Sequence, residues 1–161
     1  MFNGAFTEFM LASLAALLVI AAVIDVRTFT ISNRLNLTIA LLAPVYWLSI
    51  ALSPWPGMAI QLGAATMVFT LLAVAFYAGM MGGGDVKLAA ALALWFSPAS
   101  TIKFLIWMSI AGGALTLCVV GWHRLKRREG RPEIPYGVAI ACGGLAILGP
   151  ILAQRFLNHF A

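Results

Sequence analysis

The sequence has 161 residues and a net charge of +5, with 63% hydrophobic and 9% charged residues. Soluble globular domains carry about 25% charged residues, so this composition excludes an ordinary soluble domain and indicates an integral membrane protein. At roughly 20 residues per span, the length leaves room for about six transmembrane helices and no soluble domain beside them. We therefore expect a single all-α, polytopic transmembrane domain over residues 1–161.

Six apolar runs, separated by polar or turn-forming segments, predict the six spans. They cover residues 6–24, 37–52, 58–80, 85–96, 102–122 and 135–157. Residues 1–9 contain no Lys or Arg, so the first run is expected to be a retained span and not a cleavable signal peptide. The polar stretch 25–36 is expected to be a loop. The fourth run covers only about 22 Å counted from Gly82, so its polar start is expected to lie below the lipid headgroups.

The basic residues predict how the spans are oriented. If the segments after the first, third and fifth spans face the cytoplasm, that side holds eight of the ten Lys and Arg residues. The eight are Arg27, Arg34, Lys87, Arg124, Lys126, Arg127, Arg128 and Arg131, and the other two are Lys103 and Arg155. By the positive-inside rule, both termini then lie on the non-cytoplasmic side. This orientation places Asp25 and Asp85 at the same depth on the cytoplasmic side.

Other sequence features argue against metal or nucleic acid as partners. Cys118 and Cys142 each lie inside an apolar run, and neither belongs to a CxxC pair. We therefore expect no metal site and no disulfide. The basic residues lie between apolar runs, which is typical of membrane topology and not of nucleic-acid binding. The basic segment 124–131 is expected to bind anionic membrane lipid.

The motif Gly82-Gly83-Gly84-Asp85 is the strongest functional signal in the chain. An ionisable group at membrane depth is costly, so a functional role is its default interpretation. Two carboxyl groups close together in a low-dielectric site share a proton, so Asp25 and Asp85 could activate water and polarise a carbonyl as a pair. The glycines would admit a substrate backbone and irregular φ and ψ angles. The alternative is that Asp85 caps a helix while Asp25 pairs with Arg27.

The run Gly82-Gly83-Gly84-Asp85 satisfies a GxGD pattern, and with Asp25 it resembles the type IV prepilin peptidase family of intramembrane aspartic proteases. The stretches Asp25-Val26-Arg27, Ile31-Ser32-Asn33, Asp85-Val86-Lys87-Leu88 and Pro135-Tyr136-Gly137 extend the resemblance over essentially the whole chain. The compact size is most similar to the branch of the family that processes Flp-type pilins. The resemblance implies that Asp25 and Asp85 are the catalytic residues.

The same resemblance implies a set of supporting or substrate-binding residues. They are Gly82, Gly84, Lys87, Arg27, Asn33, Pro135, Tyr136 and Gly137. Lys87 lies about 200° around a helix from Asp85, so it is expected to face away as an interface anchor or to contact substrate, and Arg27 has the same two interpretations. Asn33 could order the loop. Tyr136 could line the site or lie at the membrane interface.

By resemblance, the chain is a peptidase of the bacterial inner membrane that removes the leader of a prepilin or pseudopilin. The cut would follow a glycine just before the pilin's hydrophobic helix, with water as the nucleophile and no cofactor. The sequence lacks the paired cysteines that accompany methylation of the new N-terminus in larger members, so peptidase activity alone is expected. The alternatives are a small proton-coupled transporter and a related protease for preflagellin-like substrates. The pilin that is cleaved and the oligomeric state stay open.

Overall fold

The structure, a computed structural model, describes residues 4–126 and 132–160. Arg127, Arg128 and Arg131 of the expected lipid-binding segment lie outside these residues. The described chain is helical and contains no strand. Its elements are α1 (Gly4–Thr28), α2 (Asn33–Ser49), the short π-helix η1 (Pro54–Met58), α3 (Ala59–Tyr77), α4 (Gly83–Ala93), α5 (Pro98–Leu125) and α6 (Tyr136–Phe160). The all-α expectation is therefore confirmed for this part of the chain.

Four helical segments in the described residues are long and apolar enough to cross a membrane. They are α1, the continuous segment Pro54–Tyr77, α5, and residues Tyr136–Arg155 of α6. The other two helices are shorter, with 17 residues in α2 and 11 in α4. Large apolar side chains are exposed on the outer faces of the bundle, among them Leu41, Leu71 and Ile110. A soluble protein rarely exposes so much apolar surface, so the chain is a multi-pass membrane protein.

The connection between α1 and α2 is much shorter than the predicted loop 25–36. Helix α1 continues to Thr28, Phe29 has a left-handed φ of 51°, and α2 begins at Asn33. Ser32 is the N-cap of α2, and its side chain accepts a hydrogen bond from the backbone N–H of Leu35 at 3.3 Å. The predicted loop 25–36 is therefore wrong at both ends, because α1 extends into it and the capped helix α2 begins at Asn33. The ordering of the shorter connection by Asn33 stays a prediction.

A Schellman-type turn ends α3 and directs the chain toward the triple glycine. The N–H of Met80 donates to the carbonyl of Ala75 and the N–H of Gly79 to that of Phe76, both at 2.9 Å. Gly79 has a φ of +70°, a conformation that glycine adopts without steric cost. The chain therefore turns back within a few residues, which lets α4 start beside the end of α3.

Helix α4 lies inside the bundle. Seven of its 11 residues are buried, including Asp85, Leu88 and Leu92. Two indole groups tie its far end to α2, because Trp47 donates to the carbonyl of Leu94 at 2.8 Å and Trp95 donates to the carbonyl of Ile39 at 3.0 Å. These bonds give both buried indole N–H groups an acceptor in an apolar interior. The short helix is thereby held in place by its neighbours.

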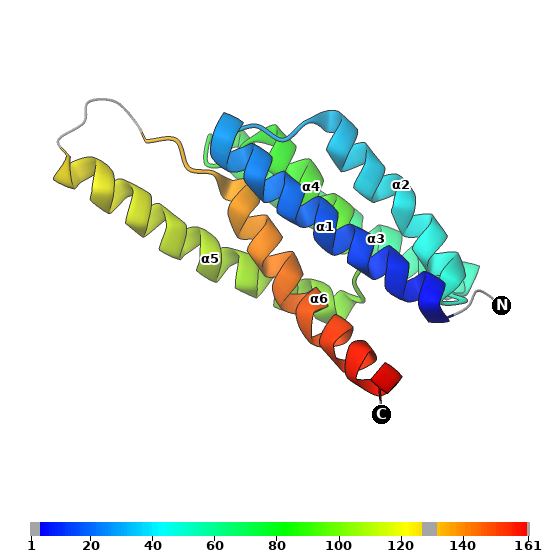
Figure 1. Cartoon of the computed structure of the whole chain (residues 1–161). Coiled ribbons are helices and arrows are strands. Elements are labelled where there is room, and N and C mark those ends of the chain that lie inside the picture. Colours follow the sequence, from blue (N-terminus) through cyan, green and yellow to red (C-terminus); the bar gives the residue numbers. More distant parts are fainter. Residues whose placement is uncertain (1–3, 127–131, 161) are drawn as a thin grey trace.

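Helix α6 packs closely on its neighbours through two adjacent glycines, Gly143 and Gly144. An added Cβ on Gly143 would lie 2.9 Å from the backbone nitrogen of Met108 in α5. One on Gly144 would lie 2.7 Å from Leu18 in α1. Small residues let membrane helices approach in this way. The resulting bundle carries the start of α1 and the end of α6 at one end, and the α1–α2 and α3–α4 connections and the start of α6 at the other (Figure 1).

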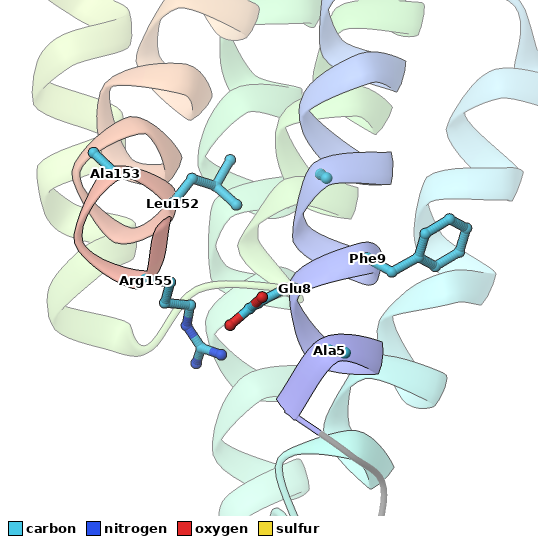
Figure 2. Close-up of a pocket in the computed structure, with 7 residues that line it drawn as sticks. Ala5, Glu8, Phe9, Leu152, Ala153 and Arg155 are labelled. Atoms are coloured by element: carbon cyan, nitrogen blue, oxygen red, sulfur yellow. The ribbon is translucent and has the colours of Figure 1, made fainter. Parts of the chain in front are cut away.

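A pocket of about 610 Å³ lies between the start of α1 and the last part of α6. Glu8 and Arg155 line it, and Figure 2 shows their charged groups pointing toward one another. The 17 residues from Glu8 to Asp25 span about 25 Å along α1. Glu8 therefore belongs to the opposite end of the bundle from the two aspartates.

Candidate active site

Asp25 lies in the last turn of α1, and its side chain reaches the first turn of α6. The backbone N–H of Val138 donates to Asp25 Oδ2 at 3.2 Å, and the backbone of Gly137 also bonds to this carboxylate. The first N–H groups of a helix have no partner within the helix and favour a negative group. Asp25, which is only 2% exposed, therefore caps α6 from a different helix and does not pair with Arg27, which is exposed.

Asp85 occupies the third position of α4. Gly82 is the N-cap of this helix, and the side chain of Asp85 bonds back to its backbone. An acid at the third helical position commonly reaches back to the N-cap N–H in this manner. The alternative that Asp85 is itself the N-cap is therefore wrong. Both aspartates are held by backbone groups at the beginning of a helix, which fixes where their carboxyl groups lie.

The structure brings the two aspartates together, although 60 residues separate them in the sequence. Their carboxyl groups are close enough to interact electrostatically. Asp85 lines a pocket of about 550 Å³, which we call the polar pocket. Its lining is Thr28, Phe29, Thr30, Gly79, Met80, Met81, Gly82, Asp85, Pro132, Glu133, Ile134 and Tyr136. Asp25 is not part of this lining, and it is more deeply buried than Asp85, with 2% of its surface exposed against 9%.

The triple glycine provides space for close contacts, and none of its three residues has a positive φ. The expectation of irregular backbone angles at these glycines is therefore wrong. An added Cβ on Gly84 would lie 2.8 Å from the carbonyl oxygen of Ile31, and one on Gly82 would lie 2.9 Å from Oδ2 of Asp85. The space that Gly82 and Gly84 provide is thus filled by this chain's own Ile31 and Asp85. Gly83 is less constrained, with only the ring edge of Phe76 at 3.3 Å.

Alanine substitutions in the triple glycine are therefore expected to have three different effects. Gly84→Ala should reduce both activity and the folded fraction, because the backbone carbonyl of Ile31 cannot move freely. Gly82→Ala should reduce activity but leave folding intact, because only the carboxyl end of Asp85 must shift. Gly83→Ala should have the smallest effect on both activity and the folded fraction. Peptidase assays and size-exclusion profiles in detergent would measure the two properties, and a Gly83→Ala protein as impaired as Gly84→Ala would contradict this order.

Helix α2 supports the beginning of α4 through two polar side chains. The amide of Asn36 donates to the carbonyl of Gly84 at 2.9 Å, and Lys87 donates to the side chain of Asn33 at 2.8 Å. Lys87 lines a different pocket from Asp85, as its helical position predicts. Asn36 is 5% exposed and was not singled out among the site residues. In the sequence, its polar side chain directly before the second apolar run is the feature that could have indicated a role at the site.

The remaining candidates lie around the same end of the bundle. Gly137 is buried, and an added Cβ there would lie 2.8 Å from Oδ2 of Asp25 and 2.6 Å from Ile31. Tyr136 lines the polar pocket, whereas Pro135 precedes α6 and is half-buried. Glu133 is a second acid in the pocket lining that the motifs did not indicate. Ile31 contacts both Gly84 and Gly137, so one side chain and its backbone separate the starts of α4 and α6.

The described residues offer no metal site. Over 4–126 and 132–160, no three His, Cys, Asp or Glu side chains are grouped closely enough to hold a metal ion. The chemistry that this arrangement can supply from its own side chains is acid–base chemistry by two neighbouring carboxyl groups.

Comparison with known proteins agrees with the motifs. No curated protein and no solved structure matched the chain. A family model described as the type IV leader peptidase family matches residues 12–117, which is more than half of the chain and includes Asp25 and Asp85. The resemblance seen in the sequence is thereby confirmed, and the chain belongs to the type IV leader peptidase family, a family of proteases.

Proposed function

We propose that this chain is an aspartic endopeptidase that removes the leader of type IV prepilins or pseudopilins of the Flp type. The observation that carries the proposal is the meeting of Asp25 and Asp85 at one end of the bundle, with each carboxyl group held at a helix N-terminus. Membership in the family supports peptidase activity and prepilin substrates. The polar pocket beside Asp85 supports a peptide ligand.

In the proposed mechanism the pair shares one proton and binds a water molecule. The ionised carboxyl group takes a proton from water as the oxygen attacks the scissile carbonyl carbon, and the protonated one donates a hydrogen bond to the carbonyl oxygen. When the tetrahedral intermediate collapses, the C–N bond breaks and the leaving amine takes a proton from the pair. The protons balance, and no cofactor is required. Backbone N–H groups of α4 and α6 keep both carboxyl groups in position.

We further propose that the whole chain, residues 1–161, is one domain that crosses the bacterial inner membrane six times, with both termini on the non-cytoplasmic side. The eight-to-two distribution of Lys and Arg supports this orientation. The α1–α2 and α3–α4 connections and the start of α6 lie at one end of the bundle in Figure 1, which supports alternating crossings. Helix α4 covers only about 16 Å, less than the roughly 30 Å hydrocarbon core. Its burial among other helices makes a short crossing acceptable, because its polar start is shielded from lipid.

A cleavage assay in membranes tests the proposal. The full chain is co-expressed with candidate Flp-type prepilins, and leader loss is followed by electrophoresis and by N-terminal sequencing of the product. The expected result is a single cut just before the hydrophobic helix of the prepilin. The proposal would be overturned if no prepilin were cleaved and the chain instead carried a pH-driven solute flux that requires Asp25 and Asp85. That result would indicate a transporter. Cleavage of preflagellins but not of prepilins would contradict the proposed substrate, whereas the proposed aspartic peptidase mechanism would still hold.

A further inference from the structure

A second cavity adjoins the polar pocket and shares part of its lining. It measures about 450 Å³ and lies between α3, α5 and α6, and we call it the apolar groove. Helix α5 packs mainly on α6 and only lightly on α3, which leaves room between them. Figure 1 shows the C-terminal half of α5 standing away from the rest of the bundle.

Three residues belong to both cavities. Met80, Met81 and Tyr136 line the polar pocket that contains Asp85, and they also line the apolar groove. A single extended ligand could therefore occupy both cavities. Its polar part would lie beside Asp85, and its apolar part would pass these three side chains into the groove.

The surface of the apolar groove suits an apolar helix. Helix α5 contributes Gly112, Gly113 and Thr116 to the lining, and small residues let two helices approach closely in a membrane. Gly113 is exposed, and an added Cβ on it would have no heavy atom within 4 Å. Gly112, by contrast, is buried against Ala139 of α6. The two adjacent glycines therefore differ, with one packing inside the protein and the other left open to the groove.

We propose that the apolar groove binds the hydrophobic helix of the prepilin while the leader lies in the polar pocket, so that the bond between them passes Asp85. This inference rests on the proposed function, because a prepilin consists of a leader followed by such a helix. A groove of about 550 Å³ between α2, α3 and α4 is less suited to this ligand. It shares no lining residue with the polar pocket, and Lys87 and Asn33 line one part of it.

Filling the groove tests the inference. Gly113→Leu adds a bulky side chain to the groove lining at a position where the Cβ meets no heavy atom within 4 Å, and it should lower the rate of leader removal about tenfold or more. Gly113→Ala should have a smaller effect. Gly121→Leu is the matched control, because Gly121 is an exposed glycine of the same helix with no heavy atom within 4 Å of an added Cβ, and it lies outside the groove lining.

Photo-crosslinking locates the bound helix directly. A photoreactive phenylalanine analogue is placed at Leu117 in the groove, at Met67 as a control, or at Phe69 in the α2–α3–α4 groove, each in an Asp25→Asn chain that retains the precursor. Leu117 and Met67 are 76% and 73% exposed, so nonspecific contact should be similar at both. The expected result is a crosslink to the prepilin helix from position 117 and none from positions 67 and 69.

The possible outcomes separate this inference from the proposed function. If the wild-type chain cleaves no prepilin, both fail. If the wild-type chain cleaves a prepilin, but Gly113→Leu cleaves it as fast as Gly121→Leu, only the assignment of the groove fails. The apolar groove would then be a surface that contacts lipid. A crosslink from position 69 in place of position 117 would move the substrate helix to the α2–α3–α4 groove and overturn the inference as well.

Discussion

Asp25→Asn and Asp85→Asn are each expected to lower leader cleavage by about 10²–10⁴-fold, the range that acid–base catalysis by one side chain supplies. Asparagine keeps the size of the side chain and one oxygen acceptor. The N–H of Val138 can therefore still donate to residue 25, and the bond between residue 85 and Gly82 can also persist. What asparagine cannot do is exchange a proton with water. The measurement is cleavage of a prepilin in membranes at equal enzyme abundance.

Glu8→Gln is the matched control for these two substitutions. Glu8 is a half-buried acid of α1, and the same acid-to-amide change at the opposite end of that helix should leave cleavage unchanged. Equal abundance of all three variants in the membrane would show that the fold is kept. Substantial turnover by either Asp variant would contradict the paired-carboxyl mechanism, because one remaining acid could then perform both proton transfers.

Gly137→Ala is expected to lower activity by about 100-fold, the cost of a misplacement of about 1 Å at a catalytic group. The added methyl group would lie 2.8 Å from Oδ2 of Asp25 and 2.6 Å from the end of Ile31. Both are ends of side chains, so they can move aside and the helices need not separate. The displaced Asp25 carboxyl group would lose its geometry toward Val138 and Asp85. The variant should therefore fold and bind substrate but cleave slowly.

Gly149→Ala provides the comparison within the same helix. An added Cβ on Gly149 has no heavy atom within 4 Å, so this substitution should change neither activity nor stability. Cleavage rates and thermal stability in detergent would be measured for both variants. If Gly137→Ala were as active as Gly149→Ala, the contact between α6 and Asp25 would have no part in positioning the acid.

Helix order and helix type were predictable from the sequence, whereas several helix ends were not. The apolar runs located the six α-helices of the described residues, because hydrophobic length is a local property of the chain. Their boundaries depend on capping. Three of the four residues 33–36 are polar (Asn33, Arg34 and Asn36), yet this segment begins α2 because Ser32 caps that helix. Similarly, α5 continues to Leu125, beyond the apolar run that predicted it.

The candidate site was predictable in its acids and only partly in their surroundings. Asp25 and Asp85 stood out because ionisable residues are rare and costly in apolar segments. The contacts of Asn36 with Gly84 and of Gly137 with Asp25 join residues 48 and 112 positions apart in the sequence. No local pattern encodes such pairs. They became visible only when the helices were packed together.

The sequence by itself determined that this is a membrane protein of the type IV leader peptidase family with two exceptional aspartates, because composition and short motifs express those properties directly. Only the tertiary structure decided what the glycines do. Local reasoning assigned Gly82 and Gly84 to unusual backbone angles, whereas folding uses them to admit Asp85 and Ile31 at less than 3 Å from where a Cβ would stand. Close approach depends on which atoms arrive from other helices, and that information arises only in the packed bundle.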